Sequence, residues 1–194
     1  CKIIFPKEYF EIHKPAVTIS GYGDEGAANH LRISKSHNEK GFEIFVYGES
    51  GFKIDRTSVK RQALEVSKSV AFNHKLDMES TFFLQQNHEA VAEGSFHNDI
   101  VSLSNENIFI AHEKAFQNKD DLNEMLKILE SKIDNFQYIE ISDSEIPLKD
   151  IINSYLINSQ LITNGDNEMQ LILPEEVKGY ENCMSWLDKL KQIS

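Results

Sequence analysis

The sequence is poor in cysteine: only Cys1 and Cys183 occur among its 194 residues. Two thiols are too few for the disulfide framework of a small secreted protein, so the composition favours a reducing compartment, and we expect a cytoplasmic location. Cys183 stands next to Met184 and near Trp186 in a segment with a helical pattern. This setting predicts a packing residue rather than a nucleophile.

Long apolar runs are also missing, since none approaches the ~20 residues needed to cross a bilayer. The first six residues, CKIIFP, lack the charged region, the apolar stretch and the cleavage site of a signal peptide, and they lack an initiator methionine. We therefore expect no membrane partner and interpret the sequence as an excised piece of a longer chain.

Basic residues are outnumbered, with 20 Lys and Arg against 31 Asp and Glu and a formal net charge of −11. Such a balance disfavours a general affinity for nucleic acid, although it says little about small substrates, because a site can be locally basic. Apolar residues make up 40% and charged residues 26%, as in ordinary globular proteins. We expect one domain over residues 1–194.

Several familiar catalytic patterns are absent. The sequence has no CxxC pair and no HExxH helix, so we expect no metal and no cofactor. The glycines around residues 21–26 do not have the spacing of a dinucleotide-binding fingerprint. No serine or cysteine lies in a GxSxG turn, which excludes the nucleophile elbow of the α/β-hydrolases.

Short β-branched and aromatic runs alternate with helical patterns along the chain. They predict strands at 16–19, 42–47, 81–84, 100–103, 108–111 and 138–141, and a hairpin formed by 161–162 and 169–173. Apolar spacings of three and four predict a helix from Thr57 or Ser58 through Val70, and one capped by Asp120 or Asp121 that continues to Ile133. Two further helices are expected at 148–156 and 181–190.

The predicted order is strand, strand, helix, strand, given twice and followed by a partial third set. Some neighbouring strands are joined by turns too short for a crossover connection, so they must be antiparallel. The pattern therefore favours an α/β fold with mixed sheets rather than a doubly wound parallel sheet.

Three polar clusters could carry chemistry. In GDEGAANH at 23–30, two carboxylates stand among small residues directly after a predicted strand, where a ligand can approach the backbone; a glycine-rich turn with solvated acids is the alternative. In EGSFHND at 93–99, His97 and Asp99 would share one face of an extended strand. That pair suits a proton-transfer group beside a carboxylate that binds a cation, and the alternative is a hydrogen-bonded structural histidine.

The third cluster is SVKRQ at 58–62, in the expected first turn of a helix. Cations at that place oppose the helix dipole, and an anionic ligand bound at the helix start would compensate. The alternative is a basic surface cluster without a ligand.

Taken together, these clusters resemble the N-succinylarginine dihydrolase family. The resemblance runs in unbroken order over nearly the whole chain, and it is carried by GDEGAANH at 23–30, FVYG at 45–48, QQN at 85–87, FHND at 96–99, SYLINSQL at 154–161 and MQLILP at 169–174. It implies the pentein fold, in which five ββαβ-type units surround a central site, and this chain would supply some of the five.

The resemblance also implies the reaction and the roles of four residues. N2-succinylarginine and two waters would give N2-succinylornithine, two ammonia and carbon dioxide. His97 would be the proton shuttle and Glu25 the catalytic acid that orients it, while Asp99 would bind the guanidinium and Arg61 a carboxylate of the substrate. The intact enzyme would be a homodimer.

In this family the nucleophilic cysteine lies in a glycine-rich segment downstream of the strand at 169–174. The sequence ends at Ser194 without such a segment. We therefore expect a pentein domain truncated at both ends and inactive alone. Two alternatives remain: another guanidine-modifying pentein, of the arginine deiminase or amidinotransferase type, and a non-catalytic binding module with this fold.

Overall fold

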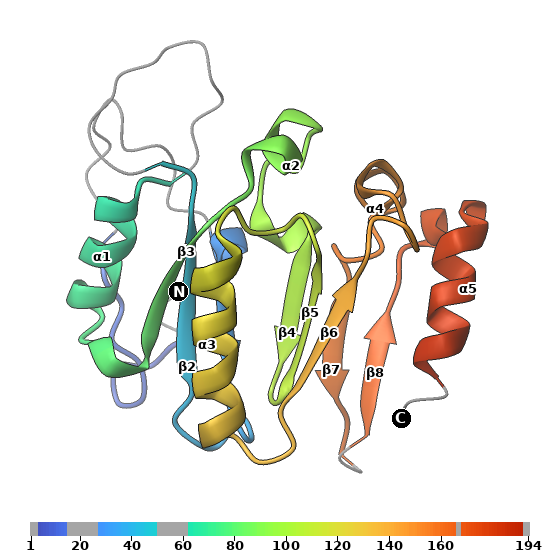
Figure 1. Cartoon of the computed structure of the whole chain (residues 1–194). Helices are drawn as coiled ribbons and strands as arrows, with labels where there is room; N and C mark the ends of the chain where they lie inside the picture. The colour runs from blue at the N-terminus through green and yellow to red at the C-terminus, as the bar shows by residue number, and fades with distance from the viewer. Residues whose placement is uncertain (1–3, 15–26, 50–61, 166–167, 192–194) are drawn as a thin grey trace.

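The computed structural model describes residues 4–14, 27–49, 62–165 and 168–191. These residues form three small sheets that stand side by side (Figure 1). The first sheet has the order β1-β2-β3, the second β4-β5-β6, and the third consists of β7 and β8.

The first unit runs β1 (His30–Ile33), β2 (Phe42–Tyr47), α1 (Leu64–Asn73) and β3 (Thr81–Gln85). β1 pairs antiparallel with β2, and β2 pairs parallel with β3. α1 lies in the long crossover connection that a parallel pair requires.

The second unit repeats this order with β4 (Ser102–Asn105), β5 (Ile108–His112), α3 (Lys119–Lys132) and β6 (Gln137–Ile141). The third begins in the same way with the antiparallel pair β7 (Gln160–Thr163) and β8 (Met169–Ile172), followed by α5 (Glu181–Leu190). The predicted α/β class with mixed sheets is therefore confirmed. The recurring order of elements is observed too, although the first unit opens with β1 and not with the strand predicted at 16–19.

Shorter elements lie between and within the units. They are the helices α2 (His88–Ala92) and α4 (Leu148–Ser154) and the 3-10 turns η1 (Ala27–Asn29), η2 (Met78–Ser80), η3 (Asn98–Ile100) and η4 (Glu175–Gly179).

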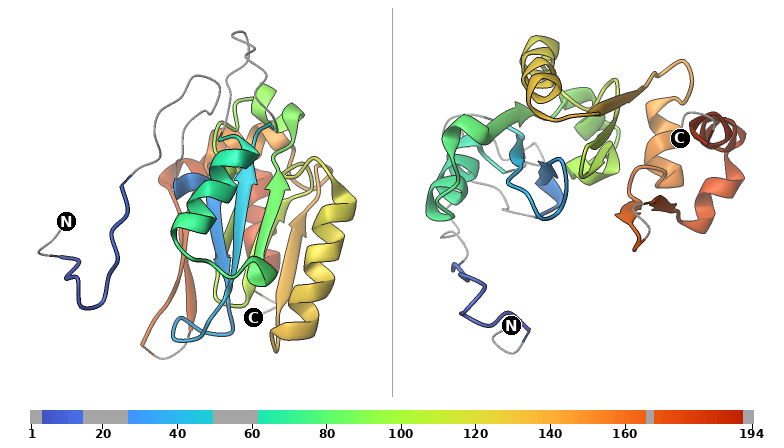
Figure 2. Two further views of the ribbon diagram at one scale, coloured as in Figure 1. Left: turned by 90° about the vertical axis from the view of Figure 1, so that its left-hand side faces the viewer. Right: turned by 90° about the horizontal axis from the view of Figure 1, so that it is seen from below.

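The three units are arranged around an arc. β4 lies between β1 and β7 in space, so the first strands of the three units adjoin in sequence order. Viewed along the strands, α1, α3 and α5 lie on the outer side of this arc (Figure 2). The strands β2, β3, β5 and β6 all end at the edge that carries α2 (Figure 1). Ligands of α/β sheets commonly bind at the carboxyl ends of strands, so this edge is the place to look for a site.

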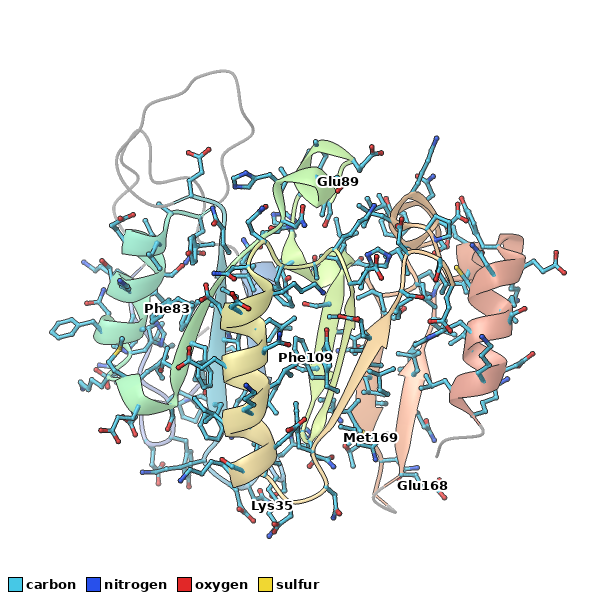
Figure 3. All side chains as sticks on the ribbon, viewed as in Figure 1. Lys35, Phe83, Glu89, Phe109, Glu168 and Met169 are labelled. Carbon is cyan, nitrogen blue, oxygen red and sulfur yellow. The ribbon has the colours of Figure 1, made fainter. Side chains whose placement is uncertain are left out.

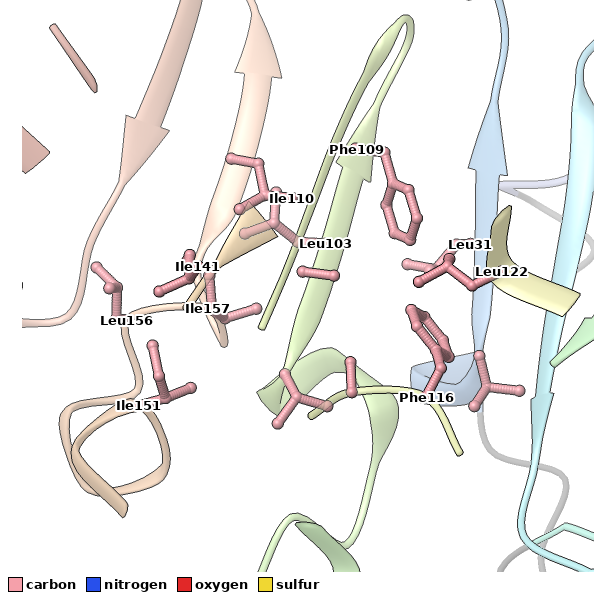
Figure 4. Close-up of a cluster of buried hydrophobic side chains, with 14 of the residues drawn as sticks. Leu31, Leu103, Phe109, Ile110, Phe116, Leu122, Ile141, Ile151, Leu156 and Ile157 are labelled. Atoms are coloured by element: carbon pink, nitrogen blue, oxygen red, sulfur yellow. The ribbon is translucent and has the colours of Figure 1, made fainter. Parts of the chain in front are cut away.

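A continuous hydrophobic core joins the units (Figure 4). Phe109, one of its largest fully buried side chains, is 0% exposed. The amphipathic stripe predicted for α3 is confirmed, because its apolar positions Leu122, Met125, Leu126 and Leu129 are all buried.

The predicted start of α1 is wrong. The helix begins at Leu64, and its N-cap Ala63 has extended backbone angles (φ −73°, ψ 151°). The backbone carbonyl of Gln62 accepts a hydrogen bond from the amide of Gly48 (2.9 Å), and the Leu64 amide donates to the carbonyl of Glu49 (3.0 Å). These bonds to the end of β2 hold the segment extended. The predicted caps Thr57 and Ser58 lie outside the described residues, and Gln62, the last residue of the basic cluster, precedes α1.

The limits of two other helices differ from the prediction because of local contacts and backbone conformation. The N-cap of α3 is Asn118, whose side chain accepts from the Asp120 amide, so neither predicted aspartate is the cap. α4 ends at Ser154, since Tyr155 adopts the left-handed conformation (φ 56°). The strand His30–Ile33 was not predicted, and the predicted strand at 16–19 lies outside the described residues.

Glu106 links the three units at the end of the strands opposite α2. Its backbone carbonyl accepts from the Ser34 amide (2.9 Å). Its carboxylate accepts from the His37 amide (3.0 Å) and from the Thr163 hydroxyl (2.7 Å). The Thr163 hydrogen bond is the main reason that the pKa of Glu106 lies below its usual range, and the amide and charge of His37 act in the same direction against burial.

We expect Glu106→Gln to lower the free energy of unfolding at pH 7 by about 1–2 kcal/mol, because a charged acceptor of two hydrogen bonds is lost. A depressed pKa in the folded state means that this stabilisation is present above the unfolded pKa of glutamate and is lost as the pH falls through the folded value. Urea unfolding from pH 7 to about pH 4 should therefore show the two proteins converging. Glu124→Gln, at an exposed position of α3, is the matched control. Equal losses in the two variants at pH 7 would contradict the linking role.

Candidate functional site

His97 and Asp99 lie on either side of Asn98 at the turn η3, which stands between α2 and the start of β4, where β4 pairs with the end of β5. Both side chains are half-buried. The prediction that they share one face of an extended strand is wrong. Only His97 is extended (φ −124°, ψ 154°), and the chain then turns, with the Val101 amide donating to the carbonyl of Asn98 (2.9 Å). For this reason β4 begins at Ser102, two residues later than predicted.

The structure nevertheless brings the two groups into electrostatic contact. Burial raises the pKa of Asp99, while the charge of His97 and the amide of Asn158 act in the opposite direction. A cation placed beside a half-buried carboxyl group of this kind stabilises its ionised form.

The loop before His97 is fixed by buried polar groups. Gln86, which follows β3, donates through Nε2 to the backbone carbonyl of Ser95 (2.8 Å) and also contacts its hydroxyl (3.3 Å). The Ser95 hydroxyl in turn donates to the carbonyl of His97 (3.2 Å). Gly94 has a φ of +110°, which side-chain-bearing residues rarely adopt. His97 is thus held by hydrogen bonds that start at the end of β3.

Two more contacts tie the same edge together. Gln85 donates through Nε2 to the carbonyl of Gly48, joining the ends of β3 and β2 (3.0 Å). Glu89 at the start of α2 pairs with Lys114, which follows β5 (2.9 Å), and it projects at the top of the molecule in Figure 3. The loop that carries His97 therefore follows a helix, α2, that is joined to both neighbouring sheets. This helix follows β3 of the first sheet and is held to the end of β5 in the second sheet by the Glu89–Lys114 ion pair.

The other two predicted site residues, Glu25 and Arg61, lie outside the described residues. Each is followed closely in the sequence by described residues at this edge. Ala27–Asn29 forms η1, which contacts η3, and Gln62 accepts from Gly48 at the end of β2.

Asn29 makes the direct connection between η1 and η3. Its side-chain carbonyl accepts from the backbone amide of Asn98 (3.1 Å). Sequence reasoning assigned no role to Asn29, Gln86 or Ser95. Asn29 and Gln86 stood within family motifs and Ser95 within the polar cluster at 93–99, so each had a usable signal.

Two other residues of types that often take part in catalysis, His112 and Cys183, have structural roles. His112 is buried; its Nε2 donates to the carbonyl of Ile146 (3.1 Å) and its Nδ1 accepts from the Lys114 amide (3.2 Å). Burial lowers the pKa of His112, which favours the neutral ring. Cys183 is 0% exposed in α5, burial raises the pKa of its thiol, and its Sγ lies 3.6 Å from the Ser154 hydroxyl. The prediction that Cys183 is a packing residue is confirmed.

Within the described ranges, no cluster of three or more His, Cys, Asp or Glu side chains could hold a metal ion. The helices of those ranges include none that is long and apolar enough to cross a membrane.

Comparison with known proteins gives a consistent result. A family model described as succinylarginine dihydrolase matches residues 1–194. The chain is 39% identical over 189 residues to the N-succinylarginine dihydrolase of Hahella chejuensis, an alignment that covers 94% of this chain and 42% of that protein. It is 38% identical over 189 residues to the enzyme of the same name from Ectopseudomonas mendocina, covering 95% of this chain and 42% of that protein. The chain thus spans less than half the length of these relatives.

Proposed function

The chain belongs to the succinylarginine dihydrolase family, and we propose on that basis that it forms part of a hydrolase of arginine catabolism. The reaction converts N2-succinylarginine and two waters to N2-succinylornithine, two ammonia and carbon dioxide. The substrate is a small molecule with a guanidinium group at one end and carboxylates at the other.

The observation that carries this proposal is the placement of His97 and the half-buried Asp99 on either side of Asn98 at the carboxyl edge of the sheets, where the charge of His97 acts on Asp99. A guanidinium group is a planar cation whose N–H donors match a carboxylate. Burial raises the pKa of Asp99, and a bound guanidinium would act in the opposite direction by stabilising the ionised carboxylate.

The roles follow from the chemistry. A guanidinium carbon is a poor electrophile, since its charge is spread over three nitrogens, so attack requires a thiolate and a group that protonates the departing ammonia. In the proposal Asp99 binds the guanidinium and His97 gives a proton to the leaving nitrogen. His97 then takes a proton from the water that attacks the covalent thiouronium. Two ammonia leave the same carbon, so this site acts twice in each turnover.

The remaining roles rest on the family resemblance alone. Glu25 would orient His97 and favour its protonated form, and Arg61 would meet a carboxylate of the substrate. The thiolate would come from the cysteine that the family carries in a glycine-rich segment well downstream of β8. Cys183 is a poor candidate, because it is buried in α5 and burial raises the pKa of its thiol.

The proposal extends to the whole protein. We infer a five-unit pentein to which this chain contributes three units, a homodimer in the cytoplasm, and a small-molecule substrate rather than a nucleic acid. Residues 1–194 would form part of its single catalytic domain.

The test is ammonia release from N2-succinylarginine, measured for this chain and for a longer form that continues through the expected cysteine. We expect release only from the longer form. Release by the 194-residue chain alone would contradict the assignment of the nucleophile and would make Cys183 the next residue to replace. If neither form releases ammonia, the dihydrolase proposal fails, and arginine and other guanidino compounds are the next substrates to assay.

A further inference from the structure

We propose that Asn29 is a positioning residue, which holds the turn bearing His97 and Asp99 in the geometry that the reaction needs. The inference rests on the proposed function for its catalytic consequence, while the positioning itself rests on contacts that are independent of that function.

The key contact is the hydrogen bond from the backbone amide of Asn98 to the side-chain carbonyl of Asn29 (3.1 Å). Asn98 is the first residue of η3, and the first amides of a helical turn have no partner within the turn. His97, the N-cap, makes no side-chain capping bond. Asn29 therefore caps the turn from a position 69 residues earlier in the chain.

Both residues of this hydrogen bond are buried, so water cannot replace a lost partner. Asn29 is 1% exposed and Asn98 is 0% exposed. The Asn98 side chain is already engaged, since its Nδ2 donates to the Ser102 hydroxyl at the start of β4. If the carbonyl of Asn29 were lost, the Asn98 amide would be buried without an acceptor, and the turn would have to move to reach water.

The other amide atoms of the two asparagines are buried as well. Asn29 Nδ2 and Asn98 Oδ1 are buried and have no hydrogen-bond partner among the described residues. Buried polar atoms are rarely left unpaired, because each one lowers stability. The contact that the described residues give to this pair is the bond between the Asn29 carbonyl and the Asn98 amide, and that bond fixes the position of the turn.

The consequence for catalysis is direct. His97 and Asp99 are the two neighbours of Asn98 in the sequence, so a displacement of its backbone moves both groups. A misplacement of about 1 Å can cost about a hundredfold in rate. Asn29 stands at the end of the GDEGAANH motif, four residues after Glu25, so one side chain links two segments that carry proposed site residues.

The first experiment needs only this chain. In Asn29→Ala we expect the amide hydrogen of Asn98 to exchange at least about tenfold faster than in the unaltered protein, since its acceptor is gone. We also expect the pKa of Asp99 to move from its raised value towards the usual range as the turn opens. NMR measures both quantities. Asn29→Asp retains an acceptor oxygen and should keep the Asn98 amide protected to within about threefold.

Asn105→Ala is the matched control. Asn105 is also a buried asparagine with one side-chain hydrogen bond, to Thr163 (2.8 Å), but it lies at the far end of β4. The two alanine variants should lose similar stability, while only Asn29→Ala changes the exchange of the Asn98 amide. Equal exchange rates in Asn29→Ala and the unaltered protein would overturn the positioning role. If Asn29→Ala does not fold, the Asn29→Asp variant decides. Rapid exchange of its Asn98 amide, although an acceptor oxygen is retained, would also overturn the positioning role.

The second experiment uses the longer form with the expected cysteine. We expect Asn29→Ala to lower kcat/KM for N2-succinylarginine about 10- to 100-fold, and Asn105→Ala to change it less than about threefold. Equal losses in the two variants would overturn the catalytic consequence. If the unaltered longer form releases no ammonia, the proposed function fails, and the exchange measurement still decides whether Asn29 positions the turn.

Discussion

Replacing His97 with alanine in the longer form should lower kcat for ammonia release from N2-succinylarginine by at least about a thousandfold. A single general acid-base group contributes about 10²–10⁴ to a rate. In the proposed reaction His97 serves both the departure of ammonia and the activation of water, and it does so at each of the two rounds. A loss towards the upper end of this range is therefore expected.

The matched control is His88→Ala. His88 is an exposed histidine at the start of α2 on the same edge of the sheets, and its ring lies 3.1 Å from the side chain of Gln85. Its removal should change kcat less than about threefold, because surface substitutions rarely disturb a site. Retention of more than a tenth of the activity by His97→Ala would contradict its role. Partial rescue of that variant by added imidazole would identify proton transfer as the function lost.

The elements that the sequence predicted best are those whose signal is local. The stripe of α3 repeats at helical spacing, and the β7–β8 hairpin surrounds the turn residues Asn164 and Gly165. α5 begins and ends where the pattern predicted. In each case neighbours in the sequence determine the structure, so periodicity was sufficient.

The elements that were missed depend on partners far along the chain. β1 contains His30 and Arg32 and has a weak apolar signal, yet it is a strand because it pairs with β2, where both side chains meet Glu43 (2.8 and 3.6 Å). The start of α1 is likewise decided by the bond between Gly48 and Gln62. Neither pairing has a local sequence pattern.

The candidate site likewise has features that the local sequence predicts and features that depend on distant contacts. The residues His97 and Asp99 were identified from the sequence, but the strand geometry offered for them was wrong, because η3 is a turn. The positions of both depend on Gln86 and Asn29, which reach the turn from other segments. Residue types therefore indicated the chemistry, and only the tertiary contacts revealed what positions it.

Phe109→Ala should lower the free energy of unfolding by about 3–5 kcal/mol, the usual cost of removing a phenyl ring from a packed core. Phe109 is 0% exposed in β5 and belongs to the buried cluster drawn in Figure 4. Its ring centroid is 5.3 Å from that of Tyr138 in β6 and 6.1 Å from that of Phe116. Because a domain is stable by only about 5–15 kcal/mol, a loss of this size should be evident in urea unfolding followed by circular dichroism.

Phe72→Ala is the same substitution at a position that is 80% exposed on α1, and it should change stability by less than about 0.5 kcal/mol. Losses of equal size in the two variants would mean that Phe109 is not at the core of the folded chain. The core and the site are also joined, because Phe116 forms a β-bridge with Gln86, whose side chain holds the loop before His97. A loosened core should therefore disturb the His97 turn before the chain unfolds, with faster exchange of the Asn98 amide in Phe109→Ala but not in Phe72→Ala.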